Sequence, residues 1–273
     1  METLTDYTRL CLNQITTNRW SLAEAVDGCA RAGIPAIGIW RDKIAEIGLE
    51  PGRKLVRDAG LKVTSVCRGG MFPAATREER ANRIAENKRG IDEAAELQAE
   101  TFVLVCGPAP DRDLRAARRM VEDAIAQLVP YAQERNVRLG VEPLHPMFAA
   151  EKSCITSLKE ANNLVEKFDL KTVGIVVDVY HVWWDATIER EIARARESIF
   201  EFHVSDWLVP TPDMYLGRGM MGDGCIDIRY IRSLVEAAGY HGFIEIEIFN
   251  QEIWNRPGDE VLQLIKERYL ACV

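Results

Sequence analysis

The sequence lacks the features that mark membrane and secreted proteins. Its apolar runs fall well short of the roughly 18 residues that would indicate a membrane span. The first residues, Met1 to Asp6, lack the charged and then apolar pattern of a secretion signal. No stretch rich in Pro, Gly or Ser divides the chain, and no low-complexity tract is present. We therefore expect a single domain in the cytoplasm that has no membrane partner.

Basic surface charge and paired cysteines are lacking as well. The formal net charge of -8 leaves no basic surface for a phosphate backbone, so a nucleic acid is not an expected partner. The seven cysteines have no C-x-x-C spacing and mostly lie inside apolar stretches. They are typical of small core residues in a reducing compartment, which argues against disulfides and against a cysteine-bound zinc.

What the sequence does contain is a regular alternation of strand and helix patterns. Three helical patterns end at a glycine that leads into a strand, at Gly33, Gly60 and Gly239. Strands are expected at residues 10–14, 34–39, 61–66, 102–106, 139–142, 173–178, 200–204 and 243–249. Helices are expected at residues 21–32, 76–98, 114–135, 157–168, 188–196, 228–238 and 260–270, with a long loop at 206–227.

Eight strands that alternate with helices in a chain of 273 residues predict a (β/α)8 TIM barrel. We expect this barrel to be one domain that spans residues 1–273. A doubly wound parallel sheet is the alternative that the same pattern allows.

Charged side chains stand at the carboxyl ends of the last four expected strands. The apolar run from Val173 ends in Asp178, and a buried charge there needs either a buried cation or a metal ion. Glu142, His203 and Glu247 end three other strands. Strand ends meet at one mouth of a barrel, so this mixed oxygen and nitrogen set suits Mn²⁺, Mg²⁺, Co²⁺ or Zn²⁺. The alternative is that each acid pairs with Arg or Lys or points outward.

Strand alternation extends this prediction by one layer. If Glu247 and His203 face inward, Glu245 and Glu201 do so too. We expect these two carboxylates to lie below the metal, where a buried base such as Arg138 neutralises them or where they accept hydrogen bonds that orient the ligands. A slip of register would make Glu245 the ligand in place of Glu247.

Five segments carry a resemblance to a known family. They are Glu142-Pro-Leu-His-Pro146, Asp178-x-x-His181, His203-Val-Ser-Asp-Trp207, Arg218-Gly-Met-Met-Gly-Asp-Gly224 and Gly242-Phe-Ile-Glu-Ile-Glu-Ile-Phe249. Together they resemble the sugar phosphate isomerase/epimerase superfamily of xylose isomerase-like barrels, and the similarity covers essentially the whole chain.

The resemblance implies roles for individual residues. In ketose 3-epimerases of this superfamily, a Glu, Asp, His, Glu set binds one divalent metal ion, and the two Glu act as acid and base. These roles map onto Glu142, Asp178, His203 and Glu247, with Mn²⁺ the favoured ion. The resemblance also implies that His181 and Arg218 bind a small sugar or sugar-derived substrate. We expect a homo-oligomer, or a hetero-oligomer with a small partner subunit.

Further candidates lie in the loops that follow the strands. His145 is either a catalytic residue that contacts the substrate and carries a proton, or a loop residue hydrogen-bonded to the backbone. Trp184, with Trp183 and Trp207, either forms an apolar wall for a sugar or has a structural role. Arg68, which follows the third strand, is a candidate substrate-binding residue.

The chemistry expected at such a site is removal of a proton next to the carbonyl of a ketose or oxo-sugar. Return of the proton makes the enzyme an isomerase or epimerase. Loss of a β substituent makes it a lyase, as in the related inosose dehydratases and C-glycoside deglycosidases. An abasic-site endonuclease is less compatible, because its metal cluster uses more histidines than the four present here. A non-catalytic binding subunit is the remaining class.

Overall fold

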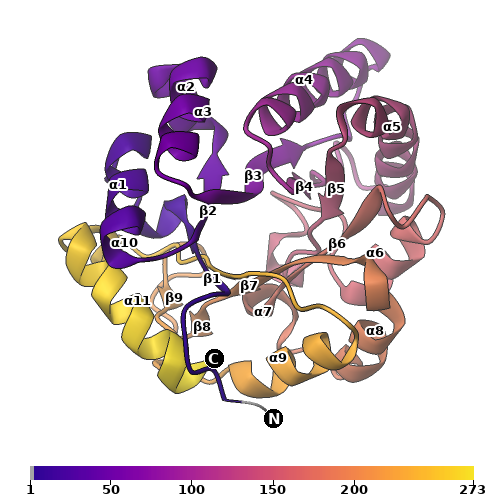
Figure 1. The fold of residues 1–273 in the computed structure, drawn as a ribbon. Helices are drawn as coiled ribbons and strands as arrows, with labels where there is room; N and C mark the ends of the chain where they lie inside the picture. The colour runs from indigo at the N-terminus through magenta and orange to yellow at the C-terminus, as the bar shows by residue number, and fades with distance from the viewer. Residues whose placement is uncertain (1–2) are drawn as a thin grey trace.

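The computed structural model describes residues 3–273 and arranges them as a closed barrel of eight parallel strands with helices around it (Figure 1). The strand order around the barrel is β1-β10-β7-β6-β5-β4-β3-β2. The predicted (β/α)8 barrel is confirmed, and the doubly wound alternative is wrong. Met1 and Glu2, at the start of the segment examined for a secretion signal, lie outside the described residues.

Every predicted strand is present, although several bounds differ. The barrel strands are β1 (Leu10–Asn13), β2 (Ala36–Trp40), β3 (Lys62–Gly70), β4 (Thr101–Val105), β5 (Arg138–Val141), β6 (Val173–Asp178), β7 (Ile199–Val204) and β10 (Ile244–Ile246). β10 is shorter than predicted because the Ile248 amide donates its hydrogen bond to the Thr16 hydroxyl instead of to a neighbouring strand.

The helices cover the outside of the barrel. They are α1 (Leu22–Ala32), α2 (Arg41–Ile47), α3 (Leu49–Asp58), α4 (Arg77–Glu96), α5 (Leu114–Arg135), α6 (Leu158–Val165), α7 (Val179–Val182), α8 (Ile188–Ala195), α9 (Ile228–Ala237), α10 (Gln251–Trp254) and α11 (Gly258–Cys272), with short 3-10 turns η1 (Gln14–Thr17), η2 (Pro146–Phe148) and η3 (Arg196–Ser198). Within residues 3–273, none of these helices combines the length and the apolar composition needed to cross a bilayer.

The segment after β7, expected as a loop, contains a small antiparallel sheet of β8 (Asp206–Trp207) and β9 (Arg218–Gly219). The Asp206 carboxylate holds the segment together by accepting hydrogen bonds from the amides of Gly222, Gly224 and Ile226. Buried backbone amides need such partners when no strand supplies them. The result is a fixed position for Arg218 above the barrel.

Candidate active site

The four predicted metal ligands lie together at the carboxyl ends of adjacent strands. Asp178 and His203 belong to β6 and β7, while Glu142 and Glu247 directly follow β5 and β10. These strands are neighbours in the order β10-β7-β6-β5. Each of the four residues offers a ligand atom, and these atoms all lie within 4.8 Å of one another. All four side chains are buried, and Glu247, not Glu245, joins the cluster.

Unsatisfied polar atoms show that the cluster suits a cation. Glu142 Oε1 and both ring nitrogens of His203 have no hydrogen-bond partner among the described residues. His203 Nδ1 lies 3.8 Å from Glu247 Oε2. Buried polar atoms in native proteins are normally paired, so atoms left free around a common point indicate a missing partner. A divalent ion held by three carboxylates and one imidazole fits this donor set.

A second polar layer supports His203 from below. Its Nε2 atom lies 3.8 Å from Glu201 Oε2 and 3.7 Å from Glu245 Oε1. A metal-binding histidine commonly directs its other ring N–H toward a carboxylate, which fixes the ring orientation. The ring thus turns Nδ1 toward Glu247 and Nε2 toward Glu201 and Glu245, and these two lower carboxylates form with His203 a second group that could hold an ion.

Glu245 is held by neutral donors, so the expectation that Arg138 neutralises it is wrong. Its carboxylate accepts hydrogen bonds from Asn13 Nδ2 at 2.6 Å, Thr64 Oγ1 at 2.7 Å and Ser65 Oγ at 3.0 Å. The Arg138 guanidinium instead donates to the backbone oxygen of Glu100 at 3.1 Å. Arginine is long enough to leave the face that strand alternation assigns to its Cβ, which is why the prediction failed.

The carboxylates of the cluster repel one another. Burial, followed by the charges of Glu247 and Asp178, raises the pKa of Glu142 to about 8. Burial also raises the pKa of Asp178, although Arg218 opposes the shift. For Glu247, burial would raise the pKa, but Arg218 and His203 outweigh it and the pKa is lowered. A cation among these groups would relieve the repulsion.

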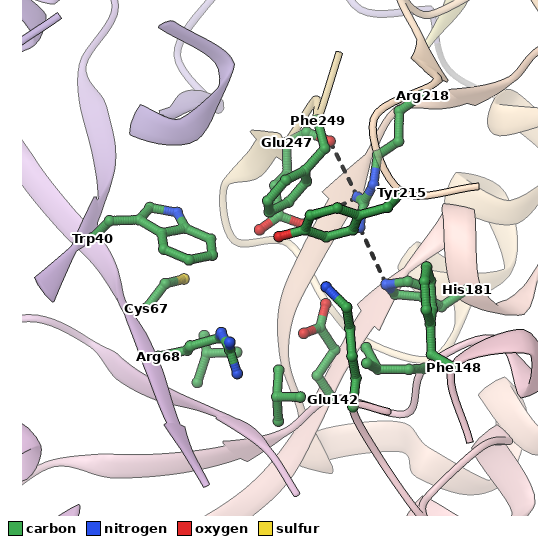
Figure 2. Close-up of a pocket in the computed structure, with 14 residues that line it drawn as sticks. Trp40, Cys67, Arg68, Glu142, Phe148, His181, Tyr215, Arg218, Glu247 and Phe249 are labelled. Carbon is green, nitrogen blue, oxygen red and sulfur yellow. Dashed lines mark hydrogen bonds and ion pairs between the residues drawn. The ribbon is translucent and has the colours of Figure 1, made fainter. Parts of the chain in front are cut away.

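Arg218 and His181 form one wall of the site. Arg218 Nη1 donates to Asp178 Oδ2 at 2.8 Å and to Glu247 Oε2 at 3.1 Å. Arg218 Nη2 lies 3.1 Å from His181 Nε2 (Figure 2). Burial, and then the charge of Arg218, lowers the pKa of His181 well below its usual value. Both predicted substrate-binding residues therefore face the cluster, and the imidazole is neutral.

A cavity of about 520 Å³, its open mouth included, lies above the cluster. Its lining includes the predicted residues Arg68, Glu142, His181, Arg218 and Glu247 (Figure 2). Of four further lining residues, Phe148, Lys152, Tyr215 and Phe249, only Phe249 has a signal in the sequence, because strand alternation turns it to the same face as Glu247. The first three lie in the irregular segments after β5 and β7, where no periodicity shows which side chains turn toward the barrel axis.

His145 and Trp184 lie beside this cavity and are not among the described residues that line it. His145 Nδ1 accepts a hydrogen bond from the Met147 amide at 3.2 Å, and its ring contacts the Trp184 ring at 5.3 Å between centroids. Trp184 Nε1 donates to the backbone oxygen of His181 at 2.9 Å. These contacts support the His181 segment from behind, and contact with a substrate stays a prediction for both residues.

The barrel and its cluster agree with the family to which the chain belongs. The family model described as xylose isomerase-like TIM barrel matches residues 26–268, so the chain is a member of that family. The resemblance noted in the sequence is confirmed.

Two characterised relatives are enzymes. The 3-dehydroshikimate dehydratase of Pseudomonas aeruginosa is 26% identical over 237 residues, which cover 84% of this chain and 36% of that enzyme. The 3-dehydro-D-guloside 4-epimerase of Escherichia coli (strain K12) is 25% identical over 223 residues, which cover 75% of this chain and 79% of the epimerase. The chain thus spans about a third of the length of the dehydratase. It is an enzyme of the sugar phosphate isomerase/epimerase superfamily.

Solved structures show the same fold. Protein SMc04130 from Sinorhizobium meliloti 1021 is 47% identical, with a TM-score of 0.96, over 98% of this chain and 99% of that one. The IolI protein, whose structure holds a zinc atom, is 18% identical, with a TM-score of 0.85, over 97% of both chains. At that identity the IolI likeness shows the fold alone.

Proposed function

We propose that the chain binds one divalent metal ion and removes a proton from the carbon next to the carbonyl group of a ketose or oxo-sugar. Return of the proton makes it an isomerase or epimerase. One observation carries the proposal: the ligand atoms of Glu142, Asp178, His203 and Glu247 lie within 4.8 Å of one another. The names of the relatives support it, because an epimerase and a dehydratase of oxo compounds can both begin with this proton removal.

Glu142, Asp178, Glu247 and the Nδ1 atom of His203 would hold the ion. When bound, it supplies positive charge that stabilises the negative charge developing on the substrate oxygen as the proton leaves. The mixed donor set suits Mn²⁺, and Zn²⁺, the ion in the IolI neighbour, is the alternative.

The chain's own residues supply the proton transfers. Glu142 and Glu247 follow strands that β6 and β7 separate, so they approach a substrate carbon from different sides. One carboxylate removes the proton and the other returns a proton to the opposite face. His181 and Arg218 hold substrate hydroxyl groups, and the rings of Phe148 and Phe249 limit the access of water.

A lyase is the second candidate, and the dehydratase relative, which matches 84% of this chain, favours it. Proton removal is then followed by cleavage of the bond between carbon and oxygen at the β position. The oxygen leaves with the bonding electrons and takes up a proton, so that water is released.

Mass spectrometry in heavy water tests both candidates. The purified protein is loaded with Mn²⁺ and incubated with free ketoses, 3-oxo-glycosides, an inosose and 3-dehydroshikimate. Deuterium incorporated without loss of mass identifies an isomerase or epimerase, and loss of water identifies a lyase. If no compound in the panel exchanges deuterium or loses water, the proposed function is wrong.

A further inference from the structure

We propose that the substrate carries an oxyanion group, a carboxylate or a phosphate, which Arg68 and Lys152 bind inside the cavity. This proposal rests on the proposed function, because it names the substrate class of the same site. Such a substrate differs from a neutral ketose, which the metal ligands, His181 and Arg218 would suffice to bind.

The two cations reach one cavity from different parts of the chain. Arg68 belongs to the end of β3, and Lys152 lies between η2 and α6, yet both line the cavity above the metal ligands. Figure 2 shows the Arg68 side chain across the cavity from Arg218 and His181. The Lys152 backbone is fixed, because its amide donates to the oxygen of Phe148 at 2.9 Å and its oxygen accepts from the amide of Gly107 at 3.0 Å.

Within residues 3–273 neither cation has a carboxylate at hydrogen-bond or ion-pair distance, although the charge of Glu151 acts on Lys152 from farther away. The Arg68 guanidinium and the Lys152 ammonium make no hydrogen bond or ion pair with a described side chain, whereas Arg218 is paired with two carboxylates. The Lys152 Nζ atom instead lies 3.2 Å from the centroid of the Tyr215 ring. A cation over an aromatic ring keeps its donors free on the other side, so Lys152 is still able to bind an anion.

The charge of Arg68 also acts on Lys152. Burial, and then the charges of Arg68 and Arg218, lowers the pKa of Lys152 to about 8. Like charges that repel one another in a partly buried cavity are unfavourable until a counter-charge arrives. An oxyanion between Arg68 and Lys152 would supply that counter-charge.

A count of the charges around the cavity indicates that the substrate would supply the anion. The three carboxylates of the cluster are balanced by a divalent ion together with Arg218. Arg68, which is exposed, and Lys152, which is half-buried, then remain as cations on the cavity lining without a paired carboxylate, while Glu201 and Glu245 lie in the layer below, beside His203. A neutral sugar would leave this charge uncompensated, whereas a carboxylate or phosphate compensates it. Arginine and lysine bind both groups through charge-assisted hydrogen bonds.

Calorimetric binding of unreactive compound pairs tests the proposal. Shikimate is compared with its neutral methyl ester, and glucitol 6-phosphate with glucitol, on the Mn²⁺-loaded protein. We expect at least one anion to bind about 10-fold or more tightly than its neutral counterpart, as charged hydrogen bonds imply. The first pair reports a carboxylate site and the second a phosphate site.

Substitutions test whether Arg68 and Lys152 cause the preference for the anionic compound. Arg68→Met and Lys152→Met keep an unbranched, flexible side chain but remove the charge, and each should reduce the preference for the anion several-fold. Lys171→Met is the matched control, because Lys171 is exposed and precedes β6, at the other end of the barrel. An unchanged content of bound Mn²⁺ will show that the variants keep the cluster intact.

Three results would overturn the proposal: equal binding of neutral and anionic compounds, a preference that persists in both variants, or no binding by any of the four compounds. Failure of the oxyanion proposal can be distinguished from failure of the proposed function. Deuterium exchange into a neutral ketose without a preference for anions rejects only the oxyanion site. A preference for anions without exchange into any ketone rejects only the proposed reaction.

Discussion

We propose that His203 takes its orientation from Glu245, a carboxylate in the layer below the four-residue cluster. Glu245 Oε1 faces the Nε2 atom at 3.7 Å, while Nδ1 faces the cluster. We predict that Glu245→Gln weakens Mn²⁺ affinity about 10-fold to 100-fold, the usual effect of losing such support. Competition with a fluorescent chelator measures the affinity. Glu100→Gln is the control, because the Glu100 carboxylate pairs with Arg138. This variant should leave the Mn²⁺ affinity unchanged.

Asp178 has the most direct effect on metal content. It is fully buried, and its Oδ1 atom accepts a hydrogen bond from the Tyr180 amide, so Asn in its place keeps the shape and that contact. The substitution removes one ligand charge, which is also the charge that pairs with Arg218. We predict that purified Asp178→Asn holds far less than one divalent ion per chain by elemental analysis.

The control for this measurement is Asp169→Asn. Asp169 precedes β6 and pairs with the Thr172 hydroxyl at the opposite end of the barrel. The Asp169→Asn variant should have the same metal content as the unaltered protein. Equal, stoichiometric metal in both variants would contradict the assignment of Asp178 as a ligand.

Lys152 gives the site a dependence on pH. The pKa of Lys152 is lowered to about 8 by burial and by Arg68 and Arg218, with Glu151 opposing the shift. The ammonium is charged below this pKa and neutral above it. We predict that shikimate or glucitol 6-phosphate, whichever binds, loses affinity as the pH rises from 7 to 9.

The same titration in Lys152→Met checks that prediction. With the titrating group removed, the affinity is already low at pH 7 and changes little up to pH 9. An identical loss of affinity with pH in both proteins would show that another group is responsible.

The structure brings together four residues whose signal in the sequence is local. An acid or imidazole that ends an apolar strand is visible along the chain, which is why Glu142, Asp178, His203 and Glu247 were identified. Lys152 carries no such mark, because its place in the cavity depends on its contact with Tyr215, which comes from a distant segment. No strand pattern assigns a direction to a loop side chain.

Helix starts were predictable for the same reason. Thr76 and Glu79 form a capping box at the start of α4, with each side chain bonded to the other residue's backbone amide. We predict that Thr76→Ala destabilises the protein by about 1 kcal/mol, as the loss of an N-cap does. Denaturant unfolding measures the loss, and Thr76→Ser, which keeps the hydroxyl, should show much less of it.

Shorter elements escaped prediction because tertiary contacts form them. α7 has four residues and is capped by Asp178, the same residue that faces the metal cluster. β8 and β9 pair over two residues each and depend on the hydrogen bonds of Asp206 to amides up to 20 positions away. Periodicity needs several turns or alternations to be detected, and these elements offer none.

The metal cluster joins four strands that come from more than a third of the chain, between Glu142 and Glu247. An unfolded chain would not hold these residues together, so the proposed ion would bind only the folded barrel and would stabilise it as a whole. At 100 times its Kd, an ion that binds only the folded state adds about 2.7 kcal/mol. For a protein of this size, that corresponds to a rise in Tm of about 5 to 10 °C.

We therefore predict that Mn²⁺ raises the Tm of the metal-free protein by this amount and that a chelator reverses the change. Thermal unfolding followed by circular dichroism measures the effect. Asp178→Asn should respond only weakly, because a ligand charge is missing, whereas Lys171→Met should respond like the unaltered chain. If the Asp178 variant gains as much stability as the unaltered chain does, the ion binds elsewhere and the four strand ends are not its site.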